Sequence, residues 1–187
     1  SWSNDDYRYI EFESGGAHGL SPVRAVDLDG DSMIDRLYAG DLDGNIWVAT
    51  PGNKGDWSSP YSQGKTTTPL FTTDSNQPIT AAPMVVRNPK EGSDPNLMVL
   101  FGTGQYLTKE DPLNSATQSF YGVLEQGSDE LTRANLEPRS LSEETIDVDG
   151  ELFDVRYADG DDVEGSVKGW YVDFDTVNGE RIIESPQ

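Results

Sequence analysis

The sequence lacks cysteine altogether and has a single histidine, His18, among its 187 residues. Without cysteine, disulfide bonds, thiol catalysis and cysteine-based zinc sites are excluded. A single histidine cannot form a histidine-rich metal centre and makes a Ser-His-Asp triad improbable. Its neighbours, in the segment Gly15-Gly-Ala-His-Gly19, predict a flexible surface loop. No run of 18 apolar residues occurs, so we expect no helix that spans a bilayer, and the residues after Ser1 are wrong for a signal peptide.

Positive charge is also scarce, because 13 Lys and Arg accompany 34 Asp and Glu and give a formal net charge of −21. Phosphate backbones and anionic membrane surfaces attract a positive protein surface, so nucleic-acid binding and direct membrane insertion are both disfavoured. The acids are densest between Glu143 and Glu164, where ten acids accompany one base, Arg156. Such a run is typical of a solvated face, and cation capture by the same stretch is the alternative.

The apolar residues come in short runs, separated by many of the 19 Gly and 11 Pro. Their β-branched and aromatic content predicts strands, and helical periodicity is scarce. The predicted strands lie near Pro22–Val26, Asp35–Ala39, Asn45–Ala49, Thr80–Val86, Leu97–Phe101, Gln118–Glu125, Glu151–Tyr157, Val167–Phe174 and Glu180–Glu184. Many short strands indicate an all-β fold of antiparallel meanders, with sandwich, barrel and propeller as the candidate architectures.

Three segments between the predicted strands carry weaker signals. Lys109–Asn114 is expected to hold a helical turn, and Ser140–Thr145 to be weakly helical at best. Thr50–Asn76 is predicted to be a long polar loop, part of which packs through Trp57 and Tyr61.

The sharpest chemical signal is the stretch Asp27–Asp35, which reads Asp-Leu-Asp-Gly-Asp-Ser-Met-Ile-Asp. Its carboxylates stand at positions 1, 3, 5 and 9, where an EF-hand loop supplies oxygen ligands, and Met33 stands at position 7, which supplies a backbone carbonyl. Carboxylates so close together repel one another unless a cation neutralises them. The pattern therefore predicts a Ca²⁺-binding loop.

Two features distinguish this stretch from an EF-hand. Position 12, where an EF-hand has a bidentate Glu, is Tyr38, and the flanks are predicted strands, so the loop should lie in a β-hairpin. Position 6, normally Gly, is Ser32, which must adopt an unusual backbone conformation at some strain and lower the affinity. The alternative interpretation is an Asp-rich turn whose side chains cap backbone amides.

The other Asp-Gly clusters lack an acid at the ninth position and are predicted to be turns. Asp41–Asn45 is expected to form a type I′-like turn around Asp43-Gly44, with a second ion as the alternative. Asp147–Glu151 and Asp159–Asp162 are likewise interpreted as turns. Gly102-Thr-Gly104 lacks the third glycine and the following helix of a nucleotide-binding loop.

Together these motifs resemble the PilY family of type IV pilus biogenesis factors. The segment Asp27–Trp47 is similar to the calcium-loop blade of that family. The further collinear matches are Pro69–Phe71, Gln77–Pro83, Val99–Leu107, Gln118–Gly122, Lys168–Tyr171 and Gly179–Arg181. The series extends from Pro22 to Pro186, whereas the Asp-rich loop alone would be less specific, because integrin-like FG-GAP propellers also use it.

The resemblance implies a C-terminal domain built as a modified β-propeller, of which residues 1–187 would be a single fragment with about two to three blades. The implied Ca²⁺ ligands are Asp27, Asp29, Asp31, the Met33 carbonyl and Asp35. Such proteins are similar in sitting at the outer envelope or pilus of Gram-negative bacteria, where they support pilus extension, twitching motility and surface adhesion under calcium control. The implied partners are pilus proteins such as minor pilins, or a host or abiotic surface.

An incomplete propeller has further consequences. The family's N-terminal von Willebrand factor A-like region and its secretion signal are expected to lie outside this fragment. The exposed sheet edges of an open stack of blades predict that the fragment self-associates or covers its edges with its long loops. No Arg-Gly-Asp triplet is present, so integrin binding is not expected.

Two other classes of function compete with a non-enzymatic pilus module. Asp41–Trp47 also resembles the blade turns of quinoprotein enzymes, although such an enzyme needs a full ring, and the chain has no adjacent cysteine pair. A carbohydrate-binding β-domain would use Trp57 and Tyr61. Tryptophans could form a sugar platform, but Trp47 and Trp170 lie within strand patterns and are predicted to be core residues.

Overall fold

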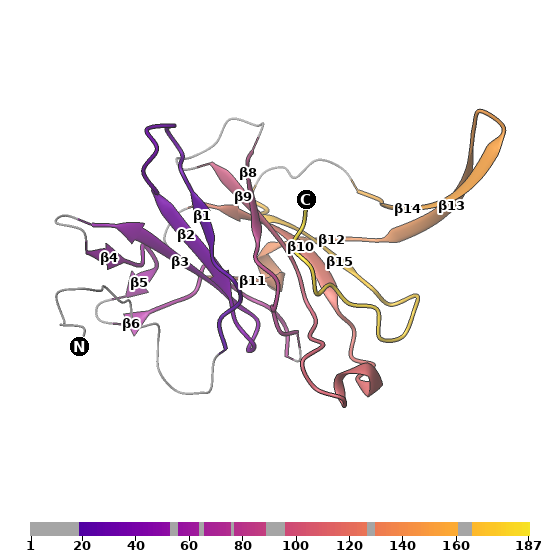
Figure 1. The fold of residues 1–187 in the computed structure, drawn as a ribbon, viewed down its shortest axis with the longest axis horizontal. Helices are drawn as coiled ribbons and strands as arrows, with labels where there is room; N and C mark the ends of the chain where they lie inside the picture. Colours follow the sequence, from indigo (N-terminus) through magenta and orange to yellow (C-terminus); the bar gives the residue numbers. More distant parts are fainter. Residues whose placement is uncertain are drawn as a thin grey trace.

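A computed structural model describes residues 19–52, 56–63, 66–75, 77–88, 96–126, 130–160 and 166–187. Its strands form two main sheets and two separate two-stranded sheets (Figure 1). In the described ranges, helical structure is limited to two 3₁₀ turns, η2 (Asp111–Leu113) and η3 (Arg133–Asn135), and no helix there is long and apolar enough to cross a membrane. The all-β prediction is therefore confirmed, and η2 confirms the predicted helical turn.

The first sheet has the strand order β1-β2-β3-β7-β11, with β4 paired to β3. Its strands are β1 (Arg24–Val26), β2 (Arg36–Gly40), β3 (Asn45–Pro51), β4 (Trp57–Ser58), β7 (Phe71–Thr72) and β11 (Leu131–Thr132). All pairs are antiparallel except β7–β11. Because Tyr38 lies opposite Val48, and Ile46 two residues away shares their face, these three side chains enter the core together.

The second sheet has the order β12-β15-β10-β9-β8. Its strands are β8 (Met84–Arg87), β9 (Leu97–Gly102), β10 (Ser119–Glu125), β12 (Glu137–Arg139) and β15 (Gly169–Asp173). Only the β12–β15 pair is parallel. Phe101 and Tyr121 lie directly opposite each other on β9 and β10, and their rings stack with centroids 5.1 Å apart.

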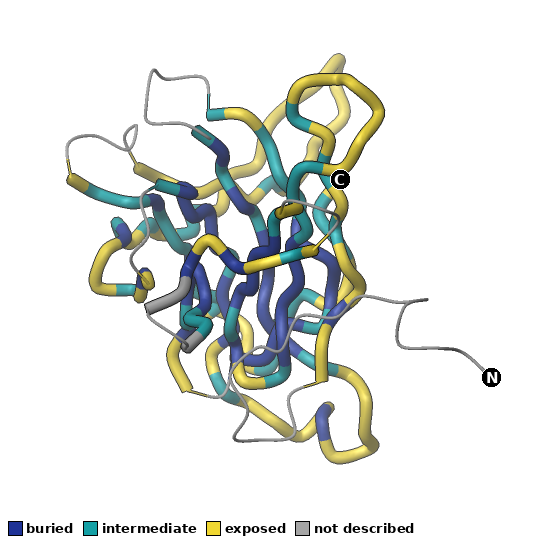
Figure 2. The backbone as a smooth tube through the Cα atoms, turned by 90° about the vertical axis from the view of Figure 1, so that its left-hand side faces the viewer, coloured by how far each residue is buried: buried dark blue, intermediate teal, exposed yellow. Residues whose placement is uncertain are grey.

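The hydrophobic core lies between the two sheets, where buried strands run through the centre of the molecule (Figure 2). Phe71 of the first sheet packs against Phe101 and Tyr121 of the second, with ring centroids 5.8 and 5.2 Å away. The two sheets thus stack like neighbouring propeller blades, and the described strands do not close into a ring. This arrangement is compatible with the predicted partial propeller.

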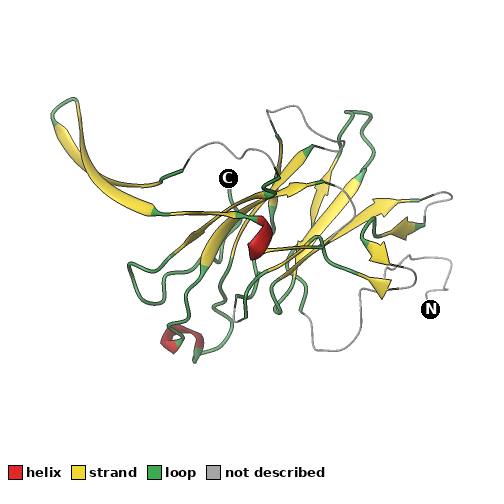
Figure 3. Cartoon of the chain, turned by 180° about the vertical axis from the view of Figure 1, so that it is seen from behind, coloured by secondary structure: helices red, strands yellow, loops and turns green. Residues whose placement is uncertain are grey.

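A long hairpin of β13 (Leu141–Val148) and β14 (Glu151–Ala158) extends away from the two sheets (Figures 1 and 3). Asp149 and Gly150 connect its strands with φ angles of 57° and 87°, as a two-residue type I′ turn requires. The turn prediction for this Asp-Gly pair is confirmed. The weak helical prediction for Ser140–Thr145 is wrong, because eight consecutive residue pairs form a ladder here.

Two further predictions need correction. Thr50–Asn76 is not one long loop, since it contains β4, β5 (Ser62–Gln63), β6 (Thr66–Thr67) and β7. Glu180–Glu184 is not a strand, because the Ile182 N–H donates one hydrogen bond to the Thr103 carbonyl at 2.9 Å and no ladder follows.

The Gly102-Thr-Gly104 stretch explains how this C-terminal segment docks. A Cβ on Gly102 would lie 2.3 Å from the Cβ of Ile182, so only glycine lets the segment approach β9. The glycines therefore serve backbone packing, as expected for a stretch that lacks a nucleotide-binding pattern. His18, Trp2 and the Asp161-Asp162 part of the predicted turn lie outside the described residues.

Candidate metal centre in the Asp27–Asp35 loop

The Asp-rich loop connects β1 to β2, as predicted for a β-hairpin setting. The Asp35 N–H donates to the Val26 carbonyl at 2.9 Å and closes the base of the loop. Leu28 turns toward the molecule and packs against the hydrophobic core. The loop is therefore held at its base and by one apolar side chain, which leaves its acidic residues facing outward.

Three carboxylates of the loop converge. One oxygen from each of Asp27, Asp29 and Asp35 lies within 4.8 Å of the other two. Ca²⁺ binds oxygens at about 2.4 Å, so two ligands on opposite sides of one ion are about 4.8 Å apart. The three oxygens therefore fit a single coordination sphere, with Asp27 and Asp29 exposed and Asp35 half-buried.

Asp31 and Met33 complete the predicted ligand set but lie differently. In the described structure Asp31 is not part of the converging group, and its Oδ1 accepts a hydrogen bond from the Met33 N–H at 2.7 Å. The Met33 side chain is exposed. The structure thus brings three of the predicted carboxylates together and uses the fourth to hold the backbone of residue 33.

The same carboxylates also shape the loop backbone. Asp27 accepts hydrogen bonds from the N–H groups of Gly30 (2.7 Å) and Ser32 (2.9 Å). Asp35 accepts one from the Leu28 N–H at 2.7 Å. These are the amide caps of the alternative interpretation, and they also pre-organise the acids, because each carboxylate oxygen has a second lone pair for a cation.

Ser32 occupies the position where an EF-hand has glycine, and its φ is 71°. This is the left-handed region, which costs a residue with a Cβ about 1–2 kcal/mol. The predicted unusual conformation of Ser32 is confirmed. The nearby Gly30, with φ of 80°, meets the same requirement without that cost.

An arginine from the second sheet braces the loop. The Arg87 guanidinium, at the end of β8, donates a short hydrogen bond to the Leu28 carbonyl. Sequence reasoning missed this residue, because the partners are 59 positions apart and no local pattern connects them. The contact ties the acidic loop to the opposite blade-like sheet.

The strand that leaves the loop is fixed by a buried ion pair. Arg36, directly after Asp35, places its Nε 3.3 Å from Oε1 of Glu125, a residue of β10 whose side chain is 2% exposed. Two residues later, the Tyr38 hydroxyl donates a hydrogen bond to the same carboxylate. Burial raises the pKa of Tyr38 well above its ordinary value, and the charge of Glu125 adds to this shift.

The second Asp-rich cluster is a structural turn. The fully buried Asp41 accepts hydrogen bonds from the Asn45 N–H (2.8 Å) and from Trp47 Nε1 (2.7 Å). The Gly44 N–H bonds to the Asp41 carbonyl at 3.2 Å, and within this turn only Gly44, at 85°, has a positive φ. The type I′ prediction is therefore wrong, because Asp43 keeps a negative φ and the left-handed residue follows the turn.

The aromatic residues of the carbohydrate hypothesis are placed unevenly. Tyr61 is 1% exposed and its hydroxyl is hydrogen-bonded to Glu125, so it cannot stack on a sugar. Trp57 is half-buried in β4. Trp47 is buried as predicted, whereas Trp170 is half-buried beneath the Arg139 guanidinium, 5.1 Å from the ring centroid.

Comparison with known proteins gives consistent matches. A family model described as the PilY1 beta-propeller domain matches residues 7–154. The type IV pilus biogenesis factor PilY1 of Pseudomonas aeruginosa PAO1 is 32% identical over 213 residues, which cover 91% of this chain and 18% of that protein. A PilY1 homolog of Xylella fastidiosa Temecula1 is 29% identical over 188 residues, which cover 91% of this chain and 12% of that protein.

A solved structure resembles most of this chain. The crystal structure of the Pseudomonas aeruginosa PilY1 C-terminal domain superimposes with a TM-score of 0.77 at 27% sequence identity. The match covers 94% of this chain and 44% of that one. The chain thus spans less than a fifth of the length of the two relatives and under half of the solved domain.

Proposed function

The chain belongs to the PilY1 family, and on this premise we propose that it is a calcium-binding, non-enzymatic module of a type IV pilus biogenesis protein. Its place would be the outer surface or pilus of a Gram-negative cell, where it supports pilus extension, twitching motility and surface adhesion. Its partners would be pilus proteins such as minor pilins, or the surface to which the pilus attaches. The observation that carries the proposal is the convergence of the Asp27, Asp29 and Asp35 carboxylates in a fold of this family.

Bound Ca²⁺ would supply positive charge and oxygen coordination at the centre of the loop. Asp27, Asp29 and Asp35 would hold the ion, and the amide caps on Asp27 and Asp35 would keep their carboxylates in place. Neutralising these charges would stiffen the connection between β1 and β2. Because Arg87 ties Leu28 to the second sheet, a stiffer loop would also stabilise the packing of the two sheets.

The competing functions have less support. The quinoprotein resemblance rests on Asp41–Trp47, whose Asp41 and Trp47 side chains bond to each other inside the turn. The carbohydrate hypothesis requires an accessible Tyr61, but this side chain is buried in the core. Asp41, Trp47 and Tyr61 are thus buried, whereas the Asp27 and Asp29 carboxylates are exposed.

The calcium proposal is tested by thermal unfolding and titration calorimetry of the purified chain with Ca²⁺ and with Mg²⁺. A ligand that binds only the folded state stabilises it by about 2.7 kcal/mol at a hundredfold excess over Kd. We expect a Kd of roughly 10⁻⁶ to 10⁻³ M, because the loop offers few protein ligands, and weaker Mg²⁺ binding, because Mg²⁺ demands tighter octahedral geometry. If millimolar Ca²⁺ does not raise the melting temperature, the loop is not a calcium site.

Three variants locate the site. Asp29→Ala removes a converging carboxylate and should abolish the calcium-induced rise in melting temperature. Asp43→Ala lies in the turn without a ninth-position acid and should keep it. Asp31→Ala distinguishes two possible sets of Ca²⁺ ligands. If Asp31 is a ligand, as in an EF-hand, the variant should lose part of the calcium-induced rise in melting temperature. If only the three converging carboxylates are ligands, the rise should be unchanged.

The cellular part of the proposal needs the full-length protein in a piliated host. Replacing Asp29 by Ala should reduce calcium-dependent twitching and surface attachment, whereas Asp43→Ala should leave both unchanged. Equal twitching of both variants and the wild type over a range of calcium concentrations would contradict a regulatory role for the loop.

A further inference from the structure

The β13–β14 hairpin has two chemically different faces. In an antiparallel pair, residues directly opposite each other point to the same face, and successive pairs alternate. One face carries the pairs Leu141/Ala158, Glu143/Arg156, Thr145/Asp154 and Asp147/Leu152. The other carries Ser142/Tyr157, Glu144/Val155, Ile146/Phe153 and Val148/Glu151. We call the first the polar face and the second the apolar face.

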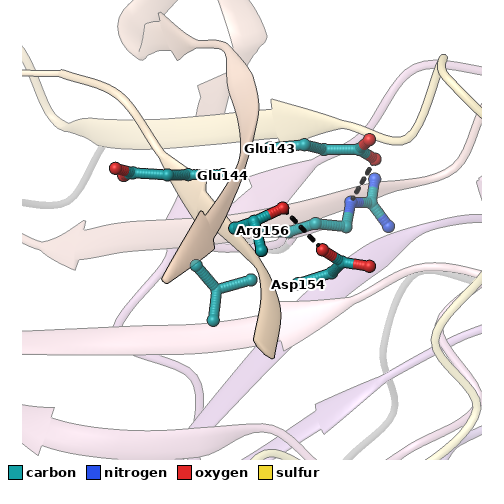
Figure 4. A pocket seen from close by; sticks show the side chains of 6 residues that line it. Glu143, Glu144, Asp154 and Arg156 are labelled. Atoms are coloured by element: carbon teal, nitrogen blue, oxygen red, sulfur yellow. Dashed lines mark hydrogen bonds and ion pairs between the residues drawn. The ribbon is translucent and has the colours of Figure 1, made fainter. Parts of the chain in front are cut away.

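The polar face is internally satisfied. Arg156 pairs with Glu143 at 3.4 Å, and Thr145 donates a hydrogen bond to Asp154 at 2.7 Å (Figure 4). Arg156 also pairs with Glu180 at 2.7 Å, which anchors the hairpin to the C-terminal segment. The charged and hydroxyl groups named here are therefore already paired, and Leu152 is a single exposed apolar residue at the end of this face.

The apolar face is left open to solvent. Four of its apolar side chains are exposed. The exposed fractions are 36% for Ile146, 49% for Val148, 44% for Phe153 and 46% for Tyr157. These side chains lie on a hairpin that projects away from both sheets (Figure 3). A two-stranded hairpin is marginally stable by itself, and contiguous exposed apolar residues mark interaction sites. The apolar face therefore lies on a projecting hairpin and is accessible to a binding partner.

The negative charge of the hairpin indicates which kind of surface can bind the apolar face. Residues 141–158 carry six acids and one base, and that base, Arg156, is already paired on the polar face. Glu144 and Glu151 stand on the apolar face itself, beside Val155 and Val148. A second copy of this chain would bring the same acids and a net charge of −21, and anionic lipid or nucleic acid would be repelled in the same way.

We propose that the apolar face of the β13–β14 hairpin docks onto a protein partner whose surface has an apolar groove flanked by lysine or arginine. Phe153 and Ile146 are the central anchors, and Glu144 and Glu151 pair with the basic flanks. The contact area of one hairpin is small, which is typical of a weak and reversible interaction. The proposal depends neither on calcium binding nor on a role in pili, so it can fail or hold separately from them.

The test uses the whole chain and a labelled synthetic helix of leucine and lysine, which presents an apolar stripe with basic flanks. Fluorescence anisotropy should show saturable binding that weakens between about 50 and 300 mM sodium chloride, because the charged flanks are screened. Phe153→Ser should weaken binding about tenfold, as expected for a central aromatic anchor. Leu152→Ser, on the polar face and more exposed than Phe153, is the matched control and should bind like the wild type.

The variants keep the net charge constant, so they separate docking from general attraction to an acidic protein. Binding that is equal in the wild type and both variants would mean general electrostatic attraction and would overturn the proposal. Absence of binding at low salt would overturn it too. Concentration-dependent dimerisation that Phe153→Ser abolishes would identify a second copy as the occupant and also contradict it.

Discussion

The hydroxyl of Tyr38 donates a hydrogen bond to the carboxylate of Glu125, and this contact joins β2 of one sheet to β10 of the other. Glu125 also receives the Arg36 ion pair and a hydrogen bond from Tyr61. The Glu125 side chain is only 2% exposed. Its charge is thus paired with three groups, those of Arg36, Tyr38 and Tyr61. Buried charges are tolerated only when they are paired in this way.

Removing Glu125 should therefore be costly. Glu125→Ala leaves the Arg36 charge and two tyrosine hydroxyls without their shared acceptor, and we expect the free energy of unfolding to fall by about 3–5 kcal/mol. Tyr38→Phe deletes one hydrogen bond and should cost about 1–2 kcal/mol. Urea unfolding measures both. Glu184→Ala, an exposed control, should change the value by less than about 0.5 kcal/mol, and a similarly small effect of Glu125→Ala would show that the ion pair is dispensable.

Alkaline pH should weaken the fold through three buried tyrosines, Tyr38, Tyr61 and Tyr121. Burial raises the pKa of Tyr38, Tyr61 and Tyr121, in the last case to about 12, from an ordinary value of 10.0. Groups whose folded pKa is raised give their full stabilisation below the unfolded pKa and lose it as the pH rises. Between pH 10 and about 12, each tyrosine should lower the free energy of unfolding by about 1.4 kcal/mol per pH unit.

Tyrosinate absorbance and urea unfolding at several pH values check this expectation. The three buried tyrosines should ionise only when the protein unfolds, and Tyr61→Phe should reduce the slope of stability against pH by about a third. Ionisation of all eight tyrosines near pH 10 with unchanged circular dichroism would contradict it.

Ser32→Gly should stabilise the protein. The substitution relieves a left-handed conformation that costs about 1–2 kcal/mol, and the greater freedom of glycine in the unfolded chain cancels about half of the gain. We expect the free energy of unfolding to rise by about 0.5–1 kcal/mol in chemical denaturation. Ser166→Gly, at an exposed serine without positive φ, should instead be slightly destabilising. Equal effects at the two serines would argue against strain at Ser32.

Two left-handed glycines should respond differently to alanine. A Cβ on Gly44 would lie 1.9 Å from Oγ1 of Thr73 and 2.7 Å from the Gln77 carbonyl, whereas one on Gly150 would meet nothing within 4 Å. Gly150→Ala should therefore cost only the conformational term of about 1–2 kcal/mol. Gly44→Ala should cost at least about 1 kcal/mol more, because the turn must also move. Equal denaturation midpoints of the two variants would refute the close packing at Gly44.

Sequence patterns located the buried strands β3 and β9 and the hairpin strand β14 closely, but they missed β13. Asn45–Ala49 and Leu97–Phe101 differ from β3 and β9 by only two and one residues at their ends, because apolar side chains of both runs are buried in the core. Ser140–Thr145 contains adjacent glutamates and no apolar alternation, yet all of it except Ser140 is part of β13. Pairing with β14 decides its conformation, and cross-strand contacts of this kind outweigh intrinsic preference. The Asp149-Gly150 turn signal was present and would have located the hairpin.

The candidate metal centre could be predicted in part. The carboxylates at positions 1, 3 and 9 of the loop converge, as their spacing predicts, because all three residues belong to one short segment of the sequence. Arg87 and Glu125 could not be found in the same way. Their contacts with Leu28 and Tyr38 join residues 59 and 87 positions apart, so they depend on how the two sheets pack.

The place of β15 bears on the synthesis of the chain. β15 is the last described strand, yet it lies between β10 and β12, and β12 has no other neighbour among the described strands. On the ribosome, β8, β9 and β10 can pair early, whereas β12 must wait until Gly169–Asp173 has emerged, with the hairpin looped out between them. A nascent chain that stops before Gly169 would therefore display the unpaired edges of β10 and β12, and such edges invite aggregation.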